Sequence, residues 1–227
     1  MSVEARSAEL ERAGWQASLQ AALELFGARA VVSTAFGATG LCLIHAAQQI
    51  DPRVQVYTID TGFLFEETKA LAETWRVERA LRLRTVLPVL STDAQATEHG
   101  DRLWERDPDR CCAIRKKEPN ARALADADLW ITALRRDGSA ARSATPMLQW
   151  ATLPSGRRLL KLAPLVTWTS KDVWRYIHAN ALPYNPLHDR GYPSVGCTHC
   201  TSAVGAGEDE RAGRWRGRTK TECGLHG

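Results

Sequence analysis

The sequence lacks any uninterrupted apolar run approaching the roughly 18 residues that a membrane-spanning helix needs. Its first residues contain acids from Glu4 onward and no apolar stretch, a composition that predicts no secretory signal. A strong charge of one sign is also missing, since 30 Lys and Arg oppose 26 Asp and Glu for a net charge of +4. These absences predict a cytoplasmic protein with no membrane segment and argue against nucleic-acid binding.

Apolar residues recur at helical spacing, and short β-branched runs lie between these segments. The expected helices are 8–26, 41–49, 66–75, 109–126 and 172–180, and the expected strands are 28–34, 54–60, 81–90, 128–135 and 158–166. This alternation predicts an α/β fold built on a single doubly wound, mostly parallel sheet. We expect residues 1–205 to form this domain. Residues 206–227, with several glycines, are expected to form a mobile C-terminal tail.

The segment from Ser33 to Gly40 lies between an expected strand and an expected helix, where parallel sheets bind ligands. Its hydroxyls and backbone N–H groups at a helix N-terminus suit a phosphate, although an ordinary strand–helix turn remains an alternative. The segment contains neither the Gly-Lys-Ser/Thr of a P-loop nor a GxGxxG fingerprint. The turn at Asp60, Thr61 and Gly62 ends the next strand and is expected beside it.

Four of the six cysteines form two pairs, Cys111 with Cys112 and Cys197 with Cys200. Four thiolates suit a tetrahedral zinc ion or an iron–sulfur cluster. Adjacent cysteines favour the cluster, because their side chains diverge and reach different iron atoms more easily than one ion. Zinc and a disulfide remain alternatives, the disulfide less favoured in a reducing compartment. Cys42 lies in an apolar helix and is interpreted as a core residue.

Cys223 follows a segment with five cations and no acid between Arg211 and Lys220. Nearby positive charge stabilises a thiolate and makes it a better nucleophile, although a solvated basic tail would have the same composition. Together with the phosphate-type loop and the paired cysteines, this segment indicates a functional thiol.

Several motifs in this order resemble the assimilatory sulfonucleotide reductases, specifically their adenosine 5′-phosphosulfate (adenylyl-sulfate) reductase branch. The motifs are residues 57–63, 110–119, 134–137, 182–201 and 222–226, and the resemblance runs from about Val31 to His226. It implies an adenine nucleotide alpha-hydrolase-like fold. The chain departs from the family's more hydroxyl-rich loop at Ala35, which interrupts the hydroxyls, and at Gly40, which closes the loop.

The resemblance implies a [4Fe–4S] cluster on the two cysteine pairs and Cys223 as the nucleophile. It implies Lys116 between cluster and substrate, with Arg211, Arg214 and His226 at the phosphosulfate end. The nucleotide would be held by residues from three segments: Ser33, Phe36, Gly37, Asp60, Thr61, Gly62 and one of Arg135 and Arg136.

The implied activity is thiol-dependent reduction of adenosine 5′-phosphosulfate to sulfite and AMP through an S-sulfocysteine, in sulfate assimilation. The implied partners are thioredoxin or a glutaredoxin-like thiol carrier and further copies of the chain in a homo-oligomer. An alternative is reduction of the 3′-phosphorylated nucleotide, although family members specific for that substrate generally lack the paired cluster cysteines. Further alternatives are an ATP-dependent ligase of the related pyrophosphatase fold, whose Ser-Gly-Gly-x-Asp-Ser loop is missing here, and a zinc module that binds nucleic acid.

Overall fold

The computed structural model describes residues 2–226 and contains one six-stranded sheet in the order β3-β2-β1-β4-β6-β5. Strands β1 to β4 and β6 are parallel, and β5 runs antiparallel to β6 at one edge. The strands are β1 (Ala30–Ser33), β2 (Gln55–Ile59), β3 (Leu83–Val86), β4 (Leu129–Ile131), β5 (Leu148–Thr152) and β6 (Arg158–Leu162). The mostly parallel α/β sheet predicted from the sequence is therefore confirmed.

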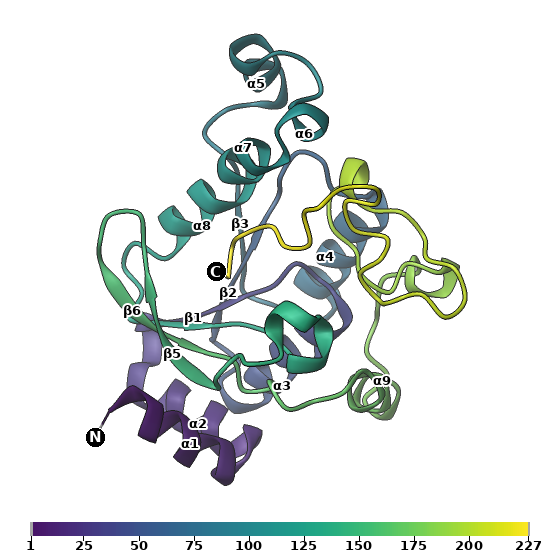
Figure 1. Cartoon of the computed structure of the whole chain (residues 1–227). Helices are drawn as coiled ribbons and strands as arrows, with labels where there is room; N and C mark the ends of the chain where they lie inside the picture. Colours follow the sequence, from purple (N-terminus) through teal and green to yellow (C-terminus); the bar gives the residue numbers. More distant parts are fainter. Residues whose placement is uncertain (1, 227) are drawn as a thin grey trace.

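Helices cover both faces of this sheet. The α-helices are α1 (Val3–Ala13), α2 (Trp15–Phe26), α3 (Ala38–Ile50), α4 (Glu66–Glu78), α5 (Thr92–His99), α6 (Leu103–Arg106), α7 (Pro108–Cys112), α8 (Glu118–Ala123) and α9 (Ser170–Ala179). Figure 1 shows α1, α2 and α3 on one side of the strands and α8 on the other. The strand order changes direction on either side of β1, so ligands are expected at the carboxyl ends of β1 and its neighbours.

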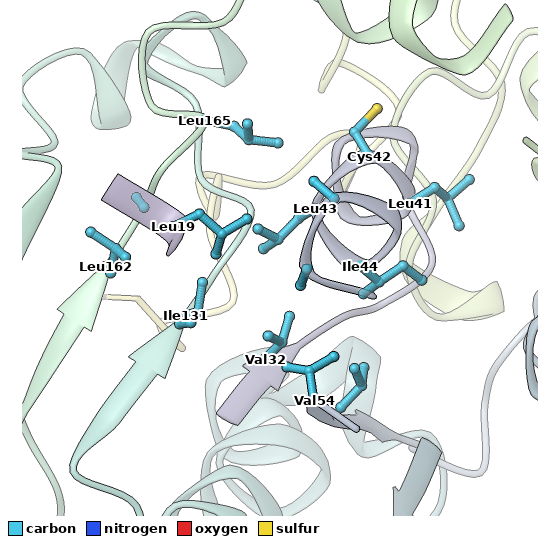
Figure 2. Packing of buried hydrophobic residues seen from close by; sticks show 14 of the residues in the cluster. Leu19, Val32, Leu41, Cys42, Leu43, Ile44, Val54, Ile131, Leu162 and Leu165 are labelled. Atoms are coloured by element: carbon cyan, nitrogen blue, oxygen red, sulfur yellow. The ribbon is translucent and has the colours of Figure 1, made fainter. Parts of the chain in front are cut away.

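The larger core lies between the sheet and α2, α3, α4 and α9. Leu41, Leu43 and Ile44 of α3 are fully buried, and Figure 2 shows Leu43 and Ile44 on the side of the helix that faces Val32 of β1. Because α3 is apolar on nearly every side, it is fixed between the sheet and α9, and its N-terminus is held at the end of β1.

A smaller core covers the other face of the sheet, where Tyr57, Trp130 and Leu159 pack with Leu124, next to α8. Leu225, from the C-terminal tail, packs against this cluster. The tail therefore contributes to the folded body of the protein. The division at residues 205 and 206, and the mobility of the tail, stay predictions.

Several expected elements have different bounds in the structure. The expected helix 8–26 is two helices, because Gly14 has a φ of +87° and ends α1. The expected helix 109–126 contains a π-helical turn, Ala113–Lys117, between α7 and α8. The expected strand 81–90 is reduced to β3, and β5 was not predicted, because as an edge strand it buries only Leu148 fully.

Local capping signals were more informative than apolar spacing. Thr169 and Asp172 form a reciprocal capping box at the start of α9, in which Thr169 Oγ1 accepts from the backbone N–H of Asp172 at 3.2 Å. Gly27 caps the C-terminus of α2, where its backbone N–H donates to the carbonyl of Leu23. Across residues 2–226, no helix combines the length and apolar content needed to cross a membrane.

Cys42 is a core residue, as predicted, and has no exposed surface (Figure 2). Burial raises the pKa of its thiol to about 12, so the thiol stays protonated and unreactive at pH 8. We predict that iodoacetamide at pH 8 leaves Cys42 unlabelled in the folded protein and labels it in urea. Peptide mass spectrometry checks this, and native labelling of Cys42 as fast as that of Cys223 would contradict it.

Candidate active site

A cavity of about 620 Å³ lies at the carboxyl ends of β1, β2 and β4, where the strand order predicts a ligand site. Its walls come from the loops after these strands, from α9 and the segment after it, and from the C-terminal tail. Residues of the walls that matter below are Ser33, Gly37, Gly40, Thr61, Lys116, Arg135, Arg142, Cys197, Arg211, Arg214, Glu222, Cys223 and His226. The cavity is large enough for a small nucleotide.

The loop after β1 turns sharply before α3 begins. Thr34 Oγ1 accepts a hydrogen bond from the backbone N–H of Phe36 at 3.0 Å, and Phe36 has a φ of +54°. A Cβ atom at Gly40 would lie 2.7 Å from the same Thr34 oxygen, so glycine is required there for this turn to close. The loop thus presents backbone and small residues to the cavity, at the N-terminus of α3.

The structure brings only some of the expected nucleotide-binding residues to the cavity. Those on its walls are Ser33, Gly37, Thr61 and Arg135. The Phe36 side chain lies in the larger core, and the Asp60 carboxylate accepts from the N–H of Gly62 in a turn beside the cavity. Arg136 points away and donates to both carboxylate oxygens of Glu11, at 2.6 and 2.8 Å, so Arg135 is the member of the pair that faces the cavity.

The two cysteine pairs, 86 residues apart in the chain from Cys111 to Cys197, line one small cavity beside the large one. Cys111, Cys112, Cys197 and Cys200 are buried and free of disulfide bonds. Burial raises the pKa of the Cys111 thiol to about 12, and the other three sulfurs add to this effect because several thiolates so close together repel one another. Four thiols held together in this way favour binding of a positively charged centre.

The first cysteine pair owes its position to a short, well-capped helix. The Asp107 side chain accepts from the backbone N–H of Arg110 at 2.9 Å, and Pro108 occupies the first turn of α7. The π-helical turn follows directly after Cys112. Single π turns occur often at functional sites, because the added residue changes which side chains share a face.

The second pair lies on a 3₁₀ turn, in which the N–H of Cys200 donates to the carbonyl of Cys197 at 3.0 Å. This turn is bound to the loop after β2, since the N–H of Thr198 donates to the carbonyl of Phe63 at 2.8 Å. Thr61 Oγ1 also lies 3.3 Å from Cys197 Sγ. A residue expected at the nucleotide therefore also contacts a cysteine of the small cavity.

Arg115 joins the π-helical turn to the loop after β3. Its buried guanidinium donates to Gln95 Oε1 at 2.6 Å and to the carbonyls of Leu90 and Ser91 at 2.9 and 2.6 Å. It also lies 5.4 Å from the ring of Phe63. Arg115 thus fixes the first cysteine pair relative to the segment that holds the second.

Aromatic rings form the outer wall of the small cavity. The rings of Trp104 and His199 are stacked 3.9 Å apart at an angle of 7°, and Phe63 contacts both edge-on. The sequence analysis did not identify this wall. The residues that could have indicated this wall are His199, which lies between the second pair of cysteines, and the aromatic residues that precede the first pair.

The C-terminal tail is docked over the cavity, and Figure 1 shows it crossing back toward the strands in yellow. Cys223 is half-buried and packs near Cys112, Cys197, Cys200 and Trp215. Although burial alone would lower the pKa of the Lys116 ammonium, its net pKa is raised because Cys197 and Cys223 favour its charged form. Lys116 therefore lies between the paired cysteines of the small cavity and Cys223 of the tail.

Glu222 attaches the tail to the loop after β4. Its carboxylate accepts two hydrogen bonds from Arg142, both at 2.8 Å, and others from Ser139 and Arg211, each at 3.1 Å. Burial opposes ionisation, but the hydrogen bonds and charge of Arg142 and Arg211 lower the pKa of Glu222. This ion-pair group was not identified from the sequence.

The five cations before Cys223 are divided between two environments. Arg211 and Arg214 line the cavity, as the resemblance implies. The other three are engaged elsewhere: Arg216 pairs with Glu208 at 2.8 Å, Lys220 with Asp109, and Arg218 donates to the carbonyl of Glu105. Only part of the positive charge expected around the thiol is therefore directed at the cavity.

These features define the class of the protein as an α/β protein with its ligand cavity at the carboxyl edge of a mostly parallel sheet. A family model described as the phosphoadenosine phosphosulfate reductase domain matches residues 29–203. The chain therefore belongs to the phosphoadenosine phosphosulfate reductase domain family.

Individual relatives are similar over most of their length. A Gloeobacter violaceus protein named phosphoadenosine 5′-phosphosulfate reductase is 45% identical over 214 residues, which cover 93% of this chain and 88% of that protein. A Halalkalibacterium halodurans protein named adenosine 5′-phosphosulfate reductase is 45% identical, covering 90% of this chain and 88% of that protein. The crystal structure of phosphoadenylyl-sulfate reductase from Candida auris, a phosphate complex, has a TM-score of 0.75 and 32% identity, covering 89% of this chain and 96% of that one.

We predict that Arg115→Met lowers the free energy of unfolding by about 1–3 kcal/mol, because it leaves the buried Gln95 Oε1 and the part-buried carbonyls of Leu90 and Ser91 without this donor. Urea denaturation measures the change. Arg110→Met, on the exposed side of the same helix, is the control and should lie within about 0.5 kcal/mol of the unmodified protein. Equal stability of the two variants would show that the Arg115 hydrogen bonds do not support the cysteine-bearing segment.

Proposed function

We propose that this protein reduces adenosine 5′-phosphosulfate to sulfite and AMP in sulfate assimilation, with a thiol as the reductant. The observation that carries the proposal is the meeting of Cys223, Lys116 and the paired cysteines at one side of a nucleotide-sized cavity. The relative from Halalkalibacterium halodurans, 45% identical, is named for this substrate. An oxidoreductase of this kind needs a nucleotide site and a reactive thiol in contact.

The relative from Gloeobacter violaceus is named for the 3′-phosphorylated nucleotide, so the names of relatives alone do not decide between the two substrates. The adjacent pair Cys111 and Cys112 favours adenosine 5′-phosphosulfate, since reductases specific for the other nucleotide generally lack it. Both cysteines face the small cavity, which supports a role for the pair in this chain.

The four cysteines of the small cavity fit a [4Fe–4S] cluster. Their thiols are free and buried, and the three neighbouring sulfurs raise the pKa of the Cys111 thiol, an effect that a bound cationic centre would relieve. A centre with several metal atoms suits this set better than zinc, because the adjacent side chains of Cys111 and Cys112 diverge and reach different iron atoms more easily than one ion. The cluster would supply a fixed electrostatic and structural centre beside the substrate.

The nucleotide is proposed to lie over the carboxyl ends of β1, β2 and β4. Ser33, Gly37, Thr61 and Arg135 are its proposed contacts, since all four line the cavity. Phe36, Asp60 and Gly62 do not line the cavity, and their backbone N–H groups donate to Thr34, Val86 and Asp60 within the protein. The phosphosulfate would extend toward Lys116, Arg211 and Arg214.

In the first step, the Cys223 thiolate attacks the sulfur of the bound phosphosulfate. A sulfur–sulfur bond forms, the bond from that sulfur to the phosphate oxygen breaks, and AMP leaves with the electron pair. The enzyme then carries S-sulfocysteine. Lys116, Arg211 and Arg214 offset the repulsion between thiolate and substrate, and such prepositioned donors are worth about 2.7–4 kcal/mol each where one has been removed.

In the second step, a thiol of a thioredoxin- or glutaredoxin-like carrier attacks the Cys223 sulfur. Sulfite leaves, and a mixed disulfide forms, which the second thiol of the carrier resolves. Two thiols are oxidised to one disulfide while the sulfur of the substrate is reduced by two electrons. The tail must open for the carrier to reach Cys223, because the docked thiol is half-buried. The expected homo-oligomer and cytoplasmic location stay predictions.

We predict that Cys223→Ser binds AMP with unchanged affinity and releases no sulfite, because serine lacks a nucleophilic thiolate. Calorimetry with AMP and a sulfite assay with dithiothreitol or thioredoxin measure the two properties. Cys42→Ala is the matched control and should retain activity, since Cys42 lies outside the cavity. Sulfite release by Cys223→Ser at the rate of the control would exclude the nucleophile.

The same assay compares the two nucleotides. The unmodified protein should have the higher kcat/KM for adenosine 5′-phosphosulfate, and a higher value for the 3′-phosphorylated form would reverse the substrate assignment.

We predict that Cys200→Ser, purified without oxygen, loses bound iron and sulfide together with the brown visible absorbance. The thiolate is the ligand, and a hydroxyl does not replace it at neutral pH. Iron and acid-labile sulfide analysis checks this, again with Cys42→Ala as the control. Purification of the unmodified protein as a colourless zinc protein would overturn the cluster.

A further inference from the structure

Lys161 is a buried lysine in the interior of the sheet. It lies on β6 between Leu160 and Leu162, is 4% exposed, and is paired in register with Trp130 of β4. Its ammonium lies 5.0 Å from the Trp130 ring. A lysine in such a strand needs a specific partner, because burying a charge without one is costly.

The partner comes from the far end of the chain. Lys161 Nζ donates a hydrogen bond to the backbone carbonyl of His226 at 3.0 Å. Within residues 2–226, no carboxylate pairs with Lys161, while burial and the nearby cation Arg142 lower the pKa of Lys161 to about 8. A charged lysine is thus unfavourable at this position unless the docked tail supplies a hydrogen-bond acceptor.

The tail is complementary to this part of the sheet in two further ways. The His226 ring stacks on the Trp130 ring at 5.1 Å and 19°, and Trp130 Nε1 donates to Ser33 Oγ at 2.7 Å. Leu225 packs on the smaller core beside them. The last residues of the tail therefore make polar, aromatic and apolar contacts with one region of the sheet, around Lys161 and Trp130.

This place lies beside the cavity wall and three residues from Cys223. Gly224, with a φ of +70°, makes the turn between the two, and a Cβ there would lie 2.7 Å from Lys117 Nζ. A tail bound at His226 and at Glu222 has little freedom at Cys223, which lies between them. Lys161 itself is not part of the cavity wall among the described residues.

We propose that Lys161 is a positioning residue, which binds the carbonyl of His226 and so fixes Cys223 over the nucleotide cavity. It acts through the backbone of the tail and does not touch the substrate. The role of the docked tail in catalysis rests on the proposed function. The docking of the tail on Lys161 does not, and it is measured without substrate.

The test compares Lys161→Met, which keeps the length and removes the donor, with Lys161→Gln, which retains a shorter donor. Lys171→Met, at an exposed position on α9, is the matched control. Iodoacetamide labelling of Cys223, followed by peptide mass spectrometry, and tryptic cleavage after Lys220 both measure how often the tail is undocked. A chain ending at Gly224 lacks the acceptor and serves as the second background.

We expect Lys161→Met to speed labelling and cleavage at least about tenfold, the equivalent of about 1.4 kcal/mol, with Lys161→Gln between it and the control. In the chain ending at Gly224, Lys161→Met should have no further effect. In the sulfite assay, kcat should fall at least about tenfold while KM for the nucleotide changes less than about twofold.

Labelling of Lys161→Met at the rate of the control would overturn the proposal, as would an equal acceleration in the truncated chain. If Lys161→Met is too unstable to purify, Lys161→Gln is compared with the control in both backgrounds, and labelling of Lys161→Gln at the rate of the control would then overturn the proposal. Faster labelling and cleavage in Lys161→Met, together with no sulfite activity in the unmodified protein, would support the positioning role and refute the proposed function. The failures of the two proposals are therefore distinguishable.

Discussion

The parallel sheet imposes the constraint on which the site depends. Strands that run in one direction end at one edge, so segments far apart in the sequence meet there. The loops after β1, β2 and β4 form the floor of the cavity. The second cysteine pair is joined to the loop after β2, and the segment of the first pair is joined to the loop after β3. Further segments are then bound to this edge by individual contacts, such as those of Arg115 and Lys161.

Charge balance is the second requirement of this arrangement. Burial and neighbouring sulfurs raise the pKa of the Cys111, Cys112 and Cys200 thiols, and the cavity for an anionic ligand lies beside them. Lys116 lies among the sulfurs. Arg211 lies at the end of the cavity proposed for the phosphosulfate, and it pairs with Glu222 while the tail is docked. Arg135, Arg142 and Arg211 each pair with a carboxylate, and Arg214 donates instead to the carbonyl of Cys200 and the hydroxyl of Ser194.

The sequence contained the parts of the fold and site that depend on local signals. The capping box of α9 and the sheet class follow from residues close in the chain, and the motif resemblance located the cysteines. Gly14, which breaks a long apolar pattern, and the π-helical turn after Cys112 were missed, because spacing alone does not register a change of helix type. The sequence left open which of Arg135 and Arg136 faces the cavity and gave no sign of the role of Lys161, since the partners Glu11 and His226 are distant in sequence.

The π-helical turn of residues 113–117 also sets the rotational phase of a longer segment. An α-helix advances by about 100° for each residue, so deleting one residue here would rotate Cys111 and Cys112 by about that angle relative to α8. On α8, Asn120 accepts a hydrogen bond from the Tyr57 hydroxyl at 2.6 Å and fixes the other end. Both cysteines would still read as a pair in the sequence, yet they would point out of the cavity. The number of residues in this segment is therefore as important for the position of the cysteine pair as the identity of those residues.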